Sequence, residues 1–115
     1  MTAATTLWTE PMMLQVDNAS LFYETAGQGS PILFIHAGVA DSRQWNNEFT
    51  RFAQRHEVIR YDMRGFGKSD PVAGEFSHLS DLNHLISHLD IQTPLILIGC
   101  SMGGGEWVGR QDRPG

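Results

Sequence analysis

The sequence predicts an α/β fold in which parallel strands are joined by crossover helices. Apolar runs at residues 32–35 and 95–98 lack polar alternation, which is typical of strands buried on both faces. Segments 41–53 and 77–89 carry apolar residues at helical spacing and precede further strand-like runs. The chain has 115 residues, a length that suits one domain, and no internal repeat or linker divides it. We therefore expect a single domain over residues 1–115.

The N-terminal part is expected to form an antiparallel hairpin. Residues 12–16 and 21–25 are short strand-like runs, and Asp17-Asn18 between them is a turn signal. A glycine-containing loop at 27–31 then leads into the apolar run at 32–35. The hairpin should precede the parallel strands without belonging to the crossover pattern.

Two helices and the strand between them come next. Asp41 or Ser42 can cap the first helix, and the strand is expected at 58–61. Ser77 is a suitable N-cap for a second helix that ends at Leu89. The predicted core-facing residues are Trp45, Phe49, Phe52 and Ala53 in the first helix, and Leu79, Leu82, Leu85, Ile86 and Leu89 in the second.

Composition excludes several classes of partner. The net charge is −5 and Lys and Arg form no cluster, so we expect neither nucleic acid nor a membrane as a partner. A single cysteine, Cys100, excludes an internal disulfide framework and suits a reducing compartment. The first ten residues have no basic and apolar leader pattern, and no apolar run approaches the ~20 residues of a membrane span. These features predict a cytoplasmic protein.

The main candidate for catalysis is Ser101. Gly99-Cys100-Ser101-Met102-Gly103 fits the pattern G-x-S-x-G, in which a serine stands on a sharp strand-to-helix turn. The pattern alone is common, but here it comes directly after the apolar run 95–98, the context that the turn requires. Cys100 occupies the flanking position and is more typical of a small buried residue than of a nucleophile.

A second candidate segment is His36-Ala37-Gly38, which comes after the buried run 32–35. Small residues there let a backbone N–H approach a substrate oxygen. In an acyl-transfer enzyme that N–H and the one of Met102 would form an oxyanion hole. The alternative is a glycine-containing loop with a half-buried histidine.

The segment 62–69 superficially resembles two nucleotide-binding patterns. Gly67-Lys68-Ser69 ends like a phosphate-binding loop, but Asp62 stands where that loop needs glycine. The dinucleotide pattern fails as well, because Asp70 replaces its third glycine. We expect a structural loop in which Asp62 pairs with Arg64.

A metal site is not expected. His84 and His88 are spaced i, i+4, but no third ligand is evident and helices commonly carry exposed histidines. The sequence predicts no metal and no cofactor.

Together, the three segments resemble the α/β-hydrolase fold family. His36-Ala37-Gly38 resembles its His-Gly-x oxyanion loop, residues 62–69 its D-x-R-G-x-G-x-S segment, and residues 99–104 its G-x-S-M-G-G nucleophile elbow. The resemblance covers residues 12–105 and is greatest to the serine-nucleophile branch, which is esterase-, lactonase- and perhydrolase-like. A dehalogenase or epoxide hydrolase of this family would carry Asp at position 101.

The resemblance implies that Ser101 is the nucleophile and that the backbone N–H groups of Gly38 and Met102 hold the oxyanion. The substrate would be a small molecule with an ester or lactone bond. Ala37 departs from the family's glycine, but it is small. The family's order is Ser, then Asp or Glu, then His, and no histidine comes after Ser101.

The fold class expected is therefore a truncated α/β-hydrolase fold: an N-terminal antiparallel hairpin, then parallel strands with crossover helices, ending just after the nucleophile elbow. Residues 105–115 have two interior glycines and a Pro-Gly ending, unlike the family's amphipathic helix. We expect the chain alone to have little or no activity.

Two alternatives stay open. The chain could be a non-catalytic fragment or binding protein of the same fold, self-associating through an uncovered outer edge of the strand at 95–98. His36 could instead serve as a surrogate base for Ser101, although a histidine in that place more often supports its loop.

Overall fold

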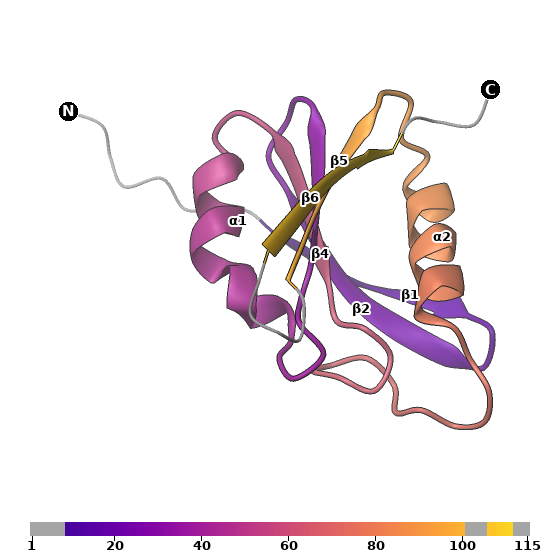
Figure 1. Cartoon of the computed structure of the whole chain (residues 1–115). Coiled ribbons are helices and arrows are strands. Elements are labelled where there is room, and N and C mark those ends of the chain that lie inside the picture. The colour runs from indigo at the N-terminus through magenta and orange to yellow at the C-terminus, as the bar shows by residue number, and fades with distance from the viewer. Residues whose placement is uncertain (1–8, 101–105, 112–115) are drawn as a thin grey trace.

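The computed structural model describes residues 9–100 and 106–111. Its strands form a six-stranded sheet in the order β1-β2-β4-β3-β5-β6, flanked by helices (Figure 1). Strands β3, β4 and β5 are parallel to one another, as predicted, whereas β1, β2 and β6 join antiparallel. The strands are β1 (Glu10–Val16), β2 (Ala19–Ala26), β3 (Pro31–Ile35), β4 (Glu57–Tyr61), β5 (Leu95–Cys100) and β6 (Glu106–Gln111).

The N-terminal hairpin is confirmed. Strands β1 and β2 pair antiparallel from Val16 opposite Ala19 outward, so Asp17 and Asn18 form the turn. Asn18 has a φ of 63°, a conformation that asparagine tolerates better than most residues. Strand β2 then pairs antiparallel with β4, which attaches the hairpin to the parallel strands.

The predicted helices are α1 and α2, and they lie on opposite sides of the sheet (Figure 1). The first begins as a 3-10 turn, η1 (Ser42–Trp45), and continues as α1 (Asn46–Phe52). Asp41 is the N-cap, since its carboxylate accepts from the Arg43 N–H at 2.9 Å. The second helix is α2 (His78–Leu89), capped by Ser77 as predicted.

Adjacent residues of the central strands face different cores. Leu33 and Ile59 pack in a cluster with Leu85 of α2. Phe34 and Val58 pack in a second cluster with residues of η1 and α1, including Trp45, Phe49 and Ala53. This alternation is the consequence of strand geometry and explains why β3, which is covered on both faces, has apolar residues at every position.

Two of the predicted core residues are exposed. Leu79 is 67% exposed and Phe52 is 37% exposed, so each was wrongly placed on the buried face of its helix. In α2 the buried position nearest the N-terminus belongs to Asp81, which is 3% exposed and lies one turn before Leu85. The acid takes this position because it has a buried basic partner, Arg64.

The segment after residues 101–105 corrects an expectation about the sheet. Residues Glu106–Gln111 form β6, which pairs antiparallel with β5 along its whole length. The outer edge of β5 is therefore covered, and the expectation of an uncovered edge there was wrong. Gly105 and Gly109 are poor helix formers, and Trp107 and Val108 favour strands, which accounts for a strand here. Self-association stays a prediction, with β1 and β6 as the edge strands.

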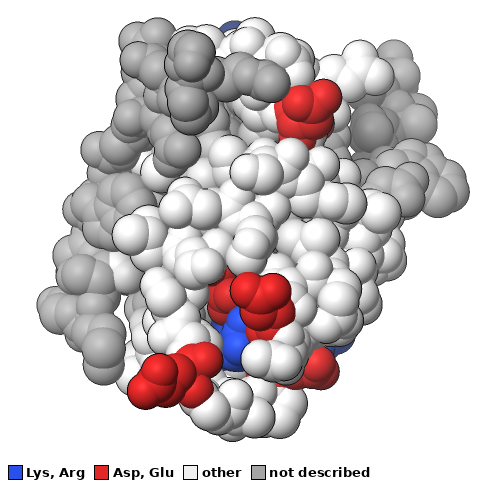
Figure 2. All heavy atoms as spheres, turned by 90° about the vertical axis from the view of Figure 1, so that its right-hand side faces the viewer, with Lys and Arg blue, Asp and Glu red and all other residues white. Residues whose placement is uncertain are grey.

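The side of the molecule beside α2 presents mostly uncharged atoms; most of its acidic and basic atoms lie in the lower part, and one acidic group lies near the top (Figure 2). Within residues 9–100 and 106–111, no helix is long and apolar enough to cross a membrane.

Candidate functional site

The strands that lead to the three candidate segments end at one side of the sheet. His36-Ala37-Gly38 comes after β3, the segment from Asp62 after β4, and Ser101 after β5. Ile35 at the end of β3 is in register with Tyr61 of β4 and with Gly99 of β5. Because the three strands are parallel neighbours, their carboxyl ends lie side by side, at the end of the sheet where α/β folds bind their ligands.

Gly38 lies in a loop that side-chain hydrogen bonds hold in place. The preceding Ala37 N–H donates to Oε1 of Gln44 at 2.8 Å, and the Ala37 carbonyl accepts from Ala40 N–H at 3.0 Å. The N–H of Gly38, in contrast, has no acceptor within the described part of the chain. Ala37 itself is buried, with 8% of its surface exposed. Within the described residues, the loop is thus held through Ala37 and not through the Gly38 N–H.

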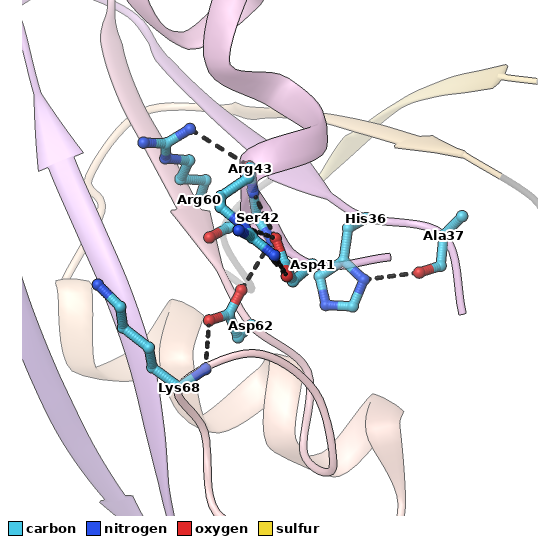
Figure 3. Close-up of polar contacts among 8 residues, drawn as sticks. All are labelled: His36, Ala37, Asp41, Ser42, Arg43, Arg60, Asp62 and Lys68. Atoms are coloured by element: carbon cyan, nitrogen blue, oxygen red, sulfur yellow. Dashed lines mark hydrogen bonds and ion pairs between the residues drawn. The ribbon is translucent and has the colours of Figure 1, made fainter. Parts of the chain in front are cut away.

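His36 joins this loop to the segment after β4. Its Nε2 accepts a hydrogen bond from Met63 N–H at 2.8 Å, so the ring proton must reside on Nδ1. Nδ1 then donates to the carbonyl of Ala37 at 2.7 Å (Figure 3). Both ring nitrogens are thus engaged, and the arrangement opposes a role for His36 as a surrogate base for Ser101.

The environment of His36 favours the neutral ring. The side chain is 1% exposed, and burial lowers its pKa below the ordinary value of 6.5. The hydrogen bond to the Ala37 carbonyl and the charges of Asp62 and Asp41 oppose this shift without reversing it. At neutral pH the ring is therefore uncharged, which is the state that lets Nε2 accept from Met63.

Asp62 is bound differently from the prediction. Its side chain does not pair with Arg64: Oδ1 accepts from Ser42 N–H at 2.7 Å, and Oδ2 accepts from Lys68 N–H at 2.8 Å (Figure 3). Asp62 is 2% exposed, so its charge is balanced by backbone donors and not by water. The carboxylate thereby ties the start of η1 to the loop after β4.

Glycine at position 67 is required by this carboxylate. Gly67 has a φ of +50°, and a Cβ there would overlap the Asp62 side chain. The D-x-R-G-x-G-x-S segment is therefore a structural loop, as predicted. Its last member, Ser69, accepts from Phe22 N–H at 2.8 Å and donates to the Asp62 carbonyl, which fastens the loop to β2.

The partner of Arg64 is Asp81, which the sequence reasoning missed. Nε and Nη2 of Arg64 donate to the two carboxylate oxygens of Asp81 at 3.1 and 2.9 Å, and both side chains are 3–4% exposed. Nη2 also donates to the carbonyl of Asp17 in the β1–β2 turn. The signal was present in the sequence: Asp81 stands at i−4 from Leu85, on the apolar stripe of its helix.

Ser101 and Met102, the predicted nucleophile and oxyanion donor, lie outside the described residues. Strand β5 leads directly to them and ends at Cys100. The strand-to-helix turn expected for this pattern is not continued by a helix at 106–111, where the structure has β6. A strand at this place agrees with the expectation that residues 105–115 are unlike the family's amphipathic helix.

The remaining histidines form no metal centre in the part of the chain that the structure covers. Among those residues, no group of three His, Cys, Asp or Glu side chains could hold a metal ion, and His84 and His88 are exposed on α2.

Known proteins are similar to this chain in both sequence and fold. A family model described as "Alpha/beta hydrolase family" matches residues 32–111. A non-heme chloroperoxidase, CPO-A1, of Kitasatospora aureofaciens is 34% identical over 107 residues, which span 87% of this chain and 38% of that protein. A soluble epoxide hydrolase of Corynebacterium sp. is 30% identical over 92 residues, 77% of this chain and 32% of that protein.

Two solved structures have the same fold over most of the chain. The epoxide hydrolase CorEH matches with a TM-score of 0.74 and 26% identity, over 81% of this chain and 34% of that one. Est816, described as an N-acyl homoserine lactone degrading enzyme, matches with a TM-score of 0.73 and 29% identity, over 80% and 36%. The chain thus spans about a third of the length of the proteins that it resembles.

Proposed function

This chain belongs to the alpha/beta hydrolase family, and on that premise we propose that it carries the nucleophile half of a serine hydrolase acting on ester or lactone bonds. The observation that supports the proposal is that the strands leading to its three candidate segments are parallel neighbours. The carboxyl ends of β4, β3 and β5 bring the loop after β4, the Gly38 loop and the approach to Ser101 to one edge of the sheet.

In this proposal Ser101 attacks the acyl carbon of the substrate and forms an acyl-enzyme, which water then hydrolyses. The N–H groups of Gly38 and Met102 stabilise the oxyanion of the tetrahedral intermediate. One such donor typically lowers the barrier by about 2.7–4 kcal/mol. Two observations support this role: the Gly38 N–H has no acceptor among the described residues, and hydrogen bonds hold both the N–H and the carbonyl of Ala37.

The choice of ester or lactone over epoxide depends on position 101. Relatives include proteins named as chloroperoxidase, epoxide hydrolase and lactone-degrading enzyme. Epoxide hydrolases of the family resembled here carry Asp at the nucleophile position, whereas this chain has Ser101. A serine there favours acyl chemistry on a small-molecule substrate, with no cofactor.

The 115-residue chain by itself should acylate slowly and fail to turn over. His36 has both nitrogens engaged, so this histidine, the one beside the Gly38 loop, is not free to activate Ser101. Oxyanion stabilisation and binding alone give about 10³–10⁴-fold acceleration over water in proteases lacking the triad. We expect acylation on that scale, with the acyl-enzyme persisting because its hydrolysis needs the same base.

Intact-mass analysis after incubation with p-nitrophenyl acetate tests this function. A single acetyl group on Ser101, absent from the Ser101→Ala variant, is the expected result. Equal acetylation of the two proteins would exclude Ser101 as the nucleophile. Fluorophosphonate labelling at a rate typical of complete serine hydrolases would instead show that the chain contains its own base.

The second candidate is a non-catalytic binding protein of the same fold. The presence of β6 where the family has a helix favours it, because a strand does not present the helix N-terminus that supports the turn. Ser101→Ala would then leave every measurable property unchanged, and light scattering would report an assembly formed through β1 or β6.

A further inference from the structure

We infer that neutral His36 is a positioning residue that latches the Gly38 loop to the loop after β4, and that protonation of its ring opens this latch. The consequence for the oxyanion rests on the proposed function, whereas the latch itself rests on hydrogen-bond geometry.

The latch consists of one ring bonded to two loops. His36 belongs to the segment after β3, and its Nε2 accepts from the N–H of Met63 in the segment after β4, at 2.8 Å. On the other side, Nδ1 donates to Ala37, the residue before Gly38, at 2.7 Å. The ring of Phe66 packs edge-on against the imidazole at 5.3 Å between centroids. The ring is therefore confined between the loops and has no room to turn away freely.

Protonation removes one of these bonds and keeps the other. A second ring proton would reside on Nε2, which then becomes a donor facing the Met63 N–H donor 2.8 Å away. Two donors at this distance repel each other, and the backbone N–H loses its acceptor. The bond from Nδ1 to the Ala37 carbonyl persists, because Nδ1 carries a proton in both states. The ring would then stay with the Gly38 loop and release the Met63 loop.

The charged groups around the ring set the pH at which this happens. Asp62 after β4 and Asp41 at the cap of η1 favour the charged ring, while His78 at the start of α2 disfavours it. Neither carboxylate bonds to the ring; their oxygens accept from Ser42, Lys68 and Arg43. Burial is the largest influence, and it holds the His36 pKa below 6.5. The latch is closed at neutral pH and opens only at a pH below 6.5.

For the proposed chemistry, the latch keeps the Gly38 N–H in one place relative to the strand that leads to Ser101. An oxyanion donor is useful only when it is held in position before the reaction. A loop released from its neighbour would present that donor less often.

Amide exchange measured by NMR on the ¹⁵N-labelled 115-residue chain tests the latch. The protection factor of the Met63 amide, corrected for intrinsic exchange, should fall by up to about tenfold for each pH unit as the pH drops from 6.5 toward the His36 midpoint, and should level off below that midpoint. The Lys68 amide, which donates to Asp62, serves as an internal control and should not follow that midpoint.

Two variants separate the latch from general acid instability. Glutamine at position 36 can accept from Met63 and donate to Ala37 without titrating, so His36→Gln should keep the amide protected and remove its pH dependence. His56→Gln is the matched control. His56 lies before β4 at the opposite end of the strand and contacts the Ser30 carbonyl, so the dependence should persist in this variant.

A Met63 protection factor that stays constant through the His36 titration would overturn the inference, and so would a proton on Nε2 at neutral pH. If His36→Gln fails to fold, the pH dependence of the Met63 amide in the wild-type chain still decides whether the latch exists. The two proposals fail separately. If Ser101 is acetylated but the protection of the Met63 amide does not depend on pH, the latch is excluded and the serine chemistry stands. If the protection of the Met63 amide depends on pH but Ser101 is not acetylated, the serine chemistry is excluded and the latch stands.

Discussion

Replacing Asp62 by asparagine should strongly destabilise the chain, although the two side chains have the same shape. The carboxylate accepts from Ser42 N–H at 2.7 Å and from Lys68 N–H at 2.8 Å, and the side chain is 2% exposed. Asparagine has one acceptor oxygen, so it can satisfy only one of these amides. Its NH₂ group would face the other amide, donor against donor.

The magnitude comes from the loss of one charge-assisted hydrogen bond and the burial of an unpaired N–H. A hydrogen bond to a charged group contributes about 1.5–3 kcal/mol, and a buried unpaired donor costs about 1–3 kcal/mol. The two figures partly describe the same lost interaction, so they are not fully additive. We therefore expect Asp62→Asn to lower the free energy of unfolding by about 2–4 kcal/mol. With a urea m-value of about 2 kcal/mol/M, the midpoint of unfolding should fall by about 1–2 M.

Urea titration followed by circular dichroism measures this shift. The matched control is Asp70→Asn, the same chemical change in the same loop. Asp70 is exposed and its side chain accepts from Ser20 N–H, a bond that asparagine can keep, so its effect should stay within about 0.5 kcal/mol. Equal midpoints for the two variants would refute the reasoning, because they would mean that the Asp62 carboxylate does not hold two buried amides.

Three further predictions concern the same loops. Asp81→Leu should destabilise the chain by about 3–5 kcal/mol by leaving Arg64 buried and unpaired, and the double variant with Arg64→Met should recover most of this loss in a urea double-mutant cycle. Gly67→Ala should lower the melting temperature more than Gly74→Ala. Both glycines have positive φ, but of the two only Gly67 lies where an added Cβ would meet the Asp62 carboxylate. Equal melting temperatures for the two variants would contradict this close approach. Folding lowers the His36 pKa, so the contribution of this residue to stability is complete above pH 6.5 and declines as the pH falls toward the folded-state pKa. The urea midpoint of the wild-type chain should therefore fall across this pH range, and in His36→Gln it should depend less on pH.

Most of the fold could be predicted from periodicity and local signals. The hairpin, the parallel strands and both helices lie where the residue pattern places them, because strand and helix periods are local properties. The cap at Ser77 was predictable for the same reason, since a serine before an amphipathic stripe satisfies the first free N–H groups. The exposure of Leu79 was not, because it depends on which neighbours the helix meets.

The strand ends that lead to the candidate residues were predictable, whereas the hydrogen bonds of the loops after β3 and β4 were less so. Gly38 and the approach to Ser101 lie at the carboxyl ends of neighbouring strands, as the order of the motifs requires. The pairing of Asp62 with Arg64 was wrong, because residues close in sequence need not face each other across a loop. Gln44, which accepts from Ala37 N–H, left no signal at all, since a glutamine at the start of a helix is ordinary.

The sequence by itself determined the family and the order of the elements, because glycine motifs and apolar periodicity depend only on residues that are close together in the chain. Only the tertiary structure decided the partners: Asp81 for Arg64, Met63 for His36, and β6 for the outer edge of β5. The physical reason is burial. A buried polar group must find a partner wherever the packing of strands and helices supplies one, and that choice depends on distances in space, which the spacing of residues along the chain does not reveal.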